Sequence, residues 1–163
     1  MNLLLTVAAV AALLGSALIA GVFFAFSSFI MNALARRPAS EGIAAMQSIN
    51  VVVLNPSFLA VFIGTAVISV LVAALAATGW GTPLTSLFLA GALLYLAGTF
   101  LVTALGNVPL NEQLATVSAT DPEAISVWEN YLEQWTLLNT IRTGAAAAAA
   151  VMFTLGLIQR GSV

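Results

Sequence analysis

The chain has 163 residues, of which 61% are hydrophobic and 6% charged, and no charged residue lies between Glu41 and Glu112. An average globular domain is about 25% charged, and a soluble domain of this length cannot bury so long an apolar stretch, so we expect a small integral membrane protein. The net charge of −2 and the absence of cysteine and histidine exclude a nucleic-acid-binding surface, a disulfide, an Fe–S cluster and the usual haem and zinc ligands.

The predicted fold class is all-α, a bundle of four transmembrane helices in a single domain over residues 1–163. A span needs about 20 apolar residues, and four segments provide them, at about 3–32, 56–77, 83–105 and 136–159. The first span ends before the two arginines and the proline at 36–38. The second and third begin with Asn-Pro56 and Thr-Pro83, which are typical helix starts.

Shorter elements are predicted between and beside the spans. Apolar residues at three-residue steps indicate a short interfacial helix over 41–54. The tight connection 78–82 places Trp80 where an interfacial aromatic residue is favoured. The proline within 107–111 predicts a helix break after the third span. A capping pattern at 120–123 then starts one long helix, whose amphipathic first third leads into the fourth span.

Four spans place both long loops, 33–55 and 106–125, on the same side of the membrane. Three arginines accompany these loops, at 36, 37 and 142, against Arg160 at the other end. Because positive residues favour the cytoplasmic side, we expect both long loops in the cytoplasm and both termini outside. The expected location is the bacterial inner (plasma) membrane.

Polar residues gather at the loop end of the predicted bundle. Unpaired polar groups at membrane depth are costly, so they pair with one another or line a wet cavity. We therefore predict a polar pocket there, formed by Asn32, Arg36, Asn50, Asn55, Asn107, Asn111, Glu112, Trp135, Asn139 and Arg142. With no histidine and no acid in the first three spans, a di-iron site is excluded, and we expect neither a metal nor an organic cofactor.

Arg142 is the strongest single candidate, because it directly precedes the apolar end of the chain. It can bind an anion or oxyanion from inside the bundle, or it can extend toward lipid phosphate from a helix end. Arg36 fits a topology and lipid anchor better than a ligand-binding role. Trp128, Tyr131 and Trp135 share one helix face, and form either an interfacial aromatic belt or a platform for a flat substrate.

The asparagines and Glu112 also have two interpretations each. Asn107 and Asn111 either cap the backbone groups freed beside the proline or direct amide donors into the pocket. Asn55 fits a plain N-cap better than a substrate-binding residue. Glu112 is either solvated or the proton acceptor of the site, and it is the best acid for that role because the acids of the last helix lie on a solvated face.

Three stretches carry motifs that are specific when taken together. They read Gly-Val-Phe-Phe-Ala-Phe-Ser-Ser-Phe-Ile-Met from 21 with Leu-Asn-Pro at 54–56, Gly-Asn-Val-Pro-Leu-Asn at 106–111, and Trp-x-x-Tyr-x-x-x-Trp-Thr-x-x-Asn-x-x-Arg-Thr at 128–143. In this order, and over nearly the whole chain, they resemble the anthrone oxygenase-like family of small four-helix membrane proteins.

The resemblance implies a four-helix membrane bundle. For fungal members it implies oxidation of a polyketide anthrone to an anthraquinone by O₂, without metal or flavin. Carried over by motif, the pocket residues it implies are Asn107, Asn111, Trp135, Asn139 and Arg142, with Asn55 and Arg36 behind them. The chain departs from relatives that commonly carry a histidine in the last motif, because residues 138–140 are Leu-Asn-Thr here.

Two functions follow as hypotheses. In the first, the protein oxidises a flat, lipid-soluble aromatic substrate with O₂: Arg142 and Asn139 stabilise its anion, Tyr131 and Trp135 stack on its rings, and Glu112 or a bound water takes the proton. In the second, a non-enzymatic membrane protein binds a hydrophobic ligand, a second copy of itself or a partner membrane protein. Both place the chain in a lipid bilayer and neither involves nucleic acid.

Overall fold

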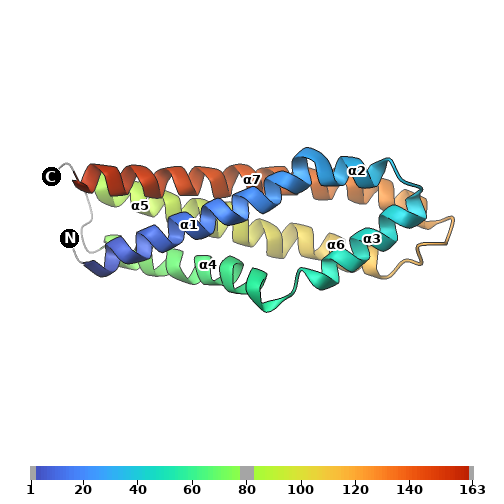
Figure 1. Ribbon diagram of the computed structural model, residues 1–163, viewed down its shortest axis with the longest axis horizontal. Coiled ribbons are helices and arrows are strands. Elements are labelled where there is room, and N and C mark those ends of the chain that lie inside the picture. The colour runs from blue at the N-terminus through green and yellow to red at the C-terminus, as the bar shows by residue number, and fades with distance from the viewer. Residues whose placement is uncertain (1–2, 78–82, 162–163) are drawn as a thin grey trace.

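The computed structural model describes residues 3–77 and 83–161, and every regular element in that part of the chain is a helix. The predicted connection with Trp80 lies outside the described residues. The long helical stretches run along the elongated molecule in Figure 1. In chain order the elements are α1 (Leu3–Ala25), η1 (Phe26–Ile30), α2 (Met31–Ala35), α3 (Ala39–Val52), α4 (Pro56–Ala77), α5 (Pro83–Leu93), η2 (Leu94–Leu101), η3 (Thr103–Asn107), α6 (Val108–Ala115) and α7 (Ala124–Gly161).

Within the described residues, four helical stretches are long and apolar enough to cross a membrane, namely Leu3–Ala35, Pro56–Ala77, Thr85–Ala115 and Ala124–Gln159. The predicted fold class is confirmed, and the chain is an integral membrane protein. The 22 residues of α4 are about 33 Å long and match a hydrocarbon core of about 30 Å. The 38 residues of α7 are about 57 Å long, so α7 extends past that core beside α2, α3 and α6 (Figure 1).

Most predicted boundaries agree with the observed ones. Helix α4, Pro56–Ala77, has the bounds predicted for the second span, and the short helix predicted over 41–54 corresponds to α3, Ala39–Val52. The first stretch continues to Ala35, three residues beyond the predicted end, because π-helical η1 joins α1 to α2 without a break. The long last helix begins at Ala124, and its first turns are amphipathic as predicted, with buried aromatic residues and exposed acids.

The predicted helix break at residues 107–111 is wrong, because the third helical stretch continues to Ala115. Pro109 lies in the first turn of α6, directly after π-helical η3. A proline inside an α-helix clashes with the carbonyl four residues before it, and the wider turn of a π-helix relieves that crowding. The helix therefore passes the proline, and the third span is longer than the predicted 83–105.

The buried side chains form two clusters. The first is mainly alanine and phenylalanine and lies between α1, α4, α5 and α7. The second lies between α2, α3, α6 and the first turns of α7, and it contains Trp128, Tyr131 and Trp135. Gln47 of α3 holds the second cluster together, because its amide donates to the carbonyls of Leu114 at 2.9 Å and Val117 at 3.0 Å.

The contact between α1 and α4 depends on Gly15, and we expect Gly15→Ala to lower the free energy of unfolding by about 1–3 kcal/mol. A methyl group there would lie 1.9 Å from Thr65 Oγ1, and that hydroxyl already donates to the Val61 carbonyl at 2.6 Å. The control variants are Gly21→Ala and Gly64→Ala, whose added methyl would meet nothing within 4 Å. Reversible unfolding in mixed detergent micelles measures all three, and equal stabilities would contradict the expectation.

Candidate functional site

Arg142 is a buried cation on α7, with 4% of its surface exposed. Its Nη2 donates to Asn139 Oδ1 at 2.8 Å and its Nη1 donates to Thr103 Oγ1 at 3.1 Å. Arg37 and Glu41 form a salt bridge on the surface. Among the described residues, no carboxylate lies within ion-pair distance of Arg142. The guanidinium therefore carries a charge that polar contacts solvate but no acid neutralises.

Two aromatic rings flank the Arg142 guanidinium, one from each apolar cluster. Its Cζ lies 4.0 Å from the centroid of the Phe23 ring and 5.0 Å from that of the Trp135 ring. Each cation–π contact contributes about 0.5–2 kcal/mol, more where the cation is desolvated. The charge thus lies where the two clusters meet, with apolar ring faces as its nearest large surfaces.

Arg142 also lies within the membrane-spanning part of the bundle. Its neighbour Phe23 packs against Phe62 of α4, with ring centroids 6.3 Å apart. Phe62 follows Pro56, the first residue of α4, by six positions, which is about 9 Å along the helix. A charge at this depth is costly and is a functional-site hypothesis by default. The Arg142 side chain is buried in the bundle. The interpretation of Arg142 as an anion-binding residue requires such a position, whereas contact with lipid phosphate requires an exposed one.

Each of the three π-helical segments in the described chain supplies a hydroxyl to this site. Ser27 of η1 accepts from Asn139 Nδ2 at 2.6 Å. Thr99 of η2 donates to the Arg142 carbonyl at 3.4 Å. Thr103 of η3 accepts from Arg142 and donates to the Thr99 carbonyl at 2.8 Å. π-helical turns are frequent at functional sites. Sequence reasoning missed these hydroxyls, whose one signal is a polar side chain at an otherwise apolar position of a span.

Asn139 is completely buried and uses its whole amide. Its Nδ2 donates to the Phe23 carbonyl at 2.7 Å as well as to Ser27, and its Oδ1 accepts from Arg142. Asn139 therefore connects α7 to α1 and η1 and fixes the orientation of the guanidinium. Its role in the geometry is to position Arg142.

Asn107 lies at the end of η3 and is 1% exposed. Its Nδ2 donates to the Trp135 carbonyl at 3.1 Å. Its Oδ1 is buried and has no hydrogen-bond partner among the described residues, and the same is true of Arg142 Nε. An acceptor and a donor, each attached to a residue that contacts Trp135, are thus left unpaired in the bundle interior.

A hydrogen-bonded aromatic ladder adjoins the charge. Asn111 Oδ1 accepts from Tyr131 Oη and from Trp135 Nε1, both at 2.8 Å. The rings of Trp128 and Tyr131 stack with centroids 5.7 Å apart, and those of Tyr131 and Trp135 with centroids 6.0 Å apart. Asn50 of α3 donates to Tyr131 Oη at 3.4 Å. All three rings are buried, so they pack the interior of the loop end instead of forming a belt toward lipid.

Six of the predicted site residues are brought together, namely Asn107, Asn111, Tyr131, Trp135, Asn139 and Arg142. Glu112 is exposed on α6, and Arg36 is exposed at the end of α2. Asn55 is the N-cap of α4, because its Oδ1 accepts from the Phe58 N–H at 3.0 Å. Neither an acid nor Arg36 therefore belongs to the buried cluster.

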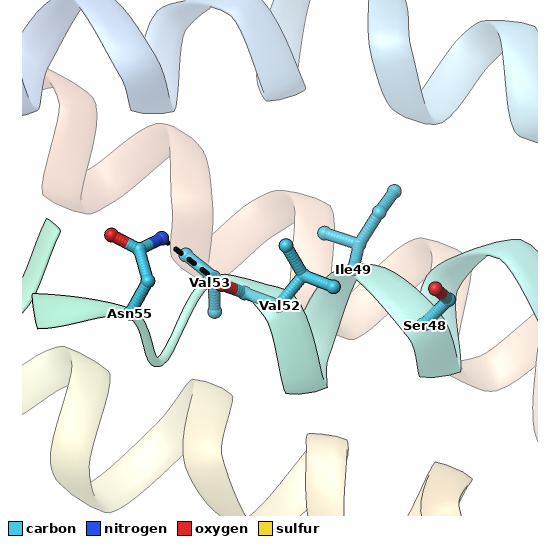
Figure 2. Close-up of a pocket in the computed structure, with 5 residues that line it drawn as sticks. All are labelled: Ser48, Ile49, Val52, Val53 and Asn55. Carbon is cyan, nitrogen blue, oxygen red and sulfur yellow. Dashed lines mark hydrogen bonds between the residues drawn. The ribbon is translucent and has the colours of Figure 1, made fainter. Parts of the chain in front are cut away.

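Asn55 also lines a pocket of about 360 Å³ on α3, together with Ser48, Ile49, Val52 and Val53 (Figure 2). Figure 2 shows the Asn55 amide bonded back to the Val52 carbonyl, at 3.0 Å, so this side chain serves the turn between α3 and α4. The pocket residues do not include Arg142 or its partners. Within the described part of the chain, no group of three His, Cys, Asp or Glu residues could hold a metal ion.

No curated protein and no solved structure matches the chain. The family model described as anthrone oxygenase matches residues 57–152, a stretch that contains Asn107, Asn111, Trp135, Asn139 and Arg142. Because this match covers more than half of the sequence, the chain belongs to the anthrone oxygenase family.

Proposed function

We propose that this protein is a membrane-embedded, cofactor-independent oxygenase that oxidises a flat, lipid-soluble aromatic ketone with O₂. The observation that carries the proposal is the buried Arg142 guanidinium, which has aromatic faces on two sides and no neutralising carboxylate among the residues that the structure describes. A charge buried at membrane depth is costly and marks a functional site by default, and a preorganised cation can stabilise an anion that forms beside it. Membership of the anthrone oxygenase family supports the same class of substrate.

The chemistry needs little from the protein. The benzylic hydrogens of an anthrone are acidic, because the resulting anion is a phenolate-like aromatic, and this anion reacts with O₂ directly. Arg142 would stabilise the oxyanion, and a preorganised donor in a dry site contributes about 100- to 1000-fold in rate. Trp135 and Tyr131 would stack on the substrate rings after local rearrangement. Asn139 would hold the guanidinium in place.

We propose further that the protein resides in the bacterial inner membrane with both long loops in the cytoplasm. The α2–α3 turn and the α6–α7 connection lie at the same end of the molecule (Figure 1). Arg36 and Arg37 belong to that end. Positive residues near the ends of spans favour the cytoplasmic side. Reporter fusions to the two ends of the chain would test this orientation.

Oxygen uptake with a simple anthrone tests the proposed activity. Purified protein in detergent should accelerate both O₂ consumption and the appearance of quinone absorbance above the spontaneous rate in empty micelles. A chelator should leave this acceleration unchanged, because no metal is involved. Equal rates with and without protein, for anthrones of several sizes, would overturn the enzymatic proposal.

A second candidate is a non-enzymatic protein that binds a hydrophobic ligand or a partner membrane protein. The observation that favours it is that Trp128, Tyr131 and Trp135 cover one another's faces, while both Glu112 and the α3 pocket lie apart from Arg142. Stoichiometric co-purification with another membrane protein, together with no oxygenase activity, would favour this candidate.

A further inference from the structure

The proposed reaction requires a base, and the buried cluster holds no side chain suited to that role. The side chains of all six Asp and Glu residues are exposed, and the sequence contains no histidine. Apart from Arg142 itself, the buried titratable groups on the elements packed around it are Tyr131 of α7 and Tyr95 of η2, because Glu129 and Glu133 of α7 are exposed. Both phenols already donate, Tyr131 to Asn111 at 2.8 Å and Tyr95 to the Phe62 carbonyl at 3.0 Å.

Two unpaired atoms indicate what takes the place of a side-chain base. Arg142 Nε is a buried donor and Asn107 Oδ1 is a buried acceptor, each without a partner among the described residues. The orientation of the Asn107 amide follows from chemistry, since only its NH₂ group can donate to the Trp135 carbonyl. The unpaired atom is therefore the oxygen. Both residues contact Trp135, and Arg142 also donates to Thr103 of η3, one turn before Asn107 in the same element.

We propose, on the basis of the proposed oxygenase function, that Arg142 Nε and Asn107 Oδ1 bind a hydroxide ion, and that this hydroxide is the base of the reaction. Hydroxide has one proton to donate and lone pairs that accept, so it satisfies Asn107 and Arg142 together. Its negative charge also compensates the guanidinium, which has no carboxylate partner in the described chain. A neutral water would satisfy the same two atoms but would leave that charge uncompensated.

The hydroxide is regenerated within one turnover. It removes one benzylic proton, which yields water and the substrate carbanion. The carbanion carbon bonds to O₂, forming a peroxide anion. The second hydrogen of that carbon then moves as a proton to the terminal peroxide oxygen, the C–H electron pair forms the C=O bond, and the O–O bond breaks, which gives the ketone and a hydroxide. The CH₂ carbon loses four electrons, O₂ gains four, and the products are one carbonyl and one water. Each intermediate carries one negative charge beside Arg142, so the guanidinium stabilises an anion throughout the reaction.

The test is the pH dependence of quinone formation by wild type, Asn107→Leu and Asn111→Leu, each after subtraction of the spontaneous rate. The rate of quinone formation by wild type should vary by less than about twofold across a range of two pH units, because its base is bound to the protein. Asn107→Leu should be inactive at neutral pH, and its rate should then rise about tenfold for each unit of increasing pH, because its base is hydroxide from bulk solution. Asn111→Leu disturbs the aromatic ladder, and it should change the rate while keeping the wild-type profile.

Each outcome decides a separate point. A wild-type rate that itself rises about tenfold per pH unit would overturn the bound hydroxide, as would parallel profiles for wild type and Asn107→Leu. Wild-type protein that fails to accelerate oxidation at any pH would overturn the proposed function as well. If Asn107→Leu does not fold, Asn107→Ser replaces it. Its hydroxyl can still accept a hydrogen bond, so it should retain a flatter profile than bulk hydroxide catalysis gives.

Discussion

Replacing Arg142 by methionine is expected to abolish oxidation above background while leaving the bundle at least as stable as the wild type. The rate should fall by at least about 100-fold, the usual effect of removing one preorganised donor to an oxyanion. The charge and its two hydrogen-bond donors to Asn139 and Thr103 are lost together. Methionine retains an unbranched apolar side chain, which can occupy the space between the Phe23 and Trp135 rings.

Opposing free-energy changes determine the expected stability of Arg142→Met. Removing the guanidinium leaves Asn139 Oδ1 without its donor, which costs about 1–3 kcal/mol. It also removes a buried, unneutralised charge, and replacing buried charged groups by apolar ones is often neutral or stabilising by about 1–4 kcal/mol. Thr103 keeps its own bond to the Thr99 carbonyl. The gain from removing the charge equals or exceeds the cost at Asn139, and the lost cation–π contacts with Phe23 and Trp135 are replaced by sulfur–aromatic contacts of about 0.3–1.5 kcal/mol each.

Arg37→Met is the matched control, since Arg37 is exposed and paired with Glu41 across one helical turn. Both the rate and the stability of this variant should stay near wild type, because exposed ion pairs contribute about 0–1 kcal/mol. Quinone formation and unfolding in mixed micelles measure the two properties. An Arg142→Met protein that keeps its activity would remove Arg142 from the site. An inactive and strongly destabilised variant would indicate that Arg142 chiefly supports the fold.

The spans were predictable because length and apolarity alone determine which segments cross a membrane. The continuous third helix was not, because the π-helical turn before Pro109 depends on tertiary contacts such as that between Thr103 and Arg142. This error also affected Glu112. A break would have left Asn111 and Glu112 free to face one pocket, whereas adjacent residues of a helix point about 100° apart, and Glu112 is exposed.

The cluster around Arg142 could be located from the sequence, because Arg142 is the last charged residue before the apolar run that begins at Gly144. The hydroxyl partners of Asn139 and Arg142 could not. A threonine or serine in a membrane helix commonly bonds the carbonyl four residues earlier, and Thr103 does bond the Thr99 carbonyl. Only the packing of η1, η2 and η3 around α7 shows that the hydroxyls of Ser27 and Thr103 also bind Asn139 and Arg142.

Asn139→Asp is expected to lower activity by at least about 100-fold and to destabilise the bundle, whereas Asn111→Asp changes activity by less than about tenfold. The two substitutions are chemically identical, but Asn139 depends on the NH₂ group of its amide, whereas Asn111 binds both of its aromatic partners through its oxygen. Asn139 donates through Nδ2 to the Phe23 carbonyl at 2.7 Å and to Ser27 at 2.6 Å. A carboxylate oxygen there would face the carbonyl oxygen, and the lost bonds would cost about 1–3 kcal/mol.

The carboxylate of Asn139→Asp would also neutralise Arg142 permanently, so that neither hydroxide nor a substrate oxyanion would gain from binding beside it. At Asn111 the acceptor Oδ1 makes both hydrogen bonds, to Tyr131 and Trp135, and a carboxylate would keep and strengthen them. Quinone formation and micellar unfolding, measured side by side, distinguish the variants. Equal losses in both would show that any new charge at the loop end disables the protein, and the specific role assigned to the neutrality of Asn139 would have to be abandoned.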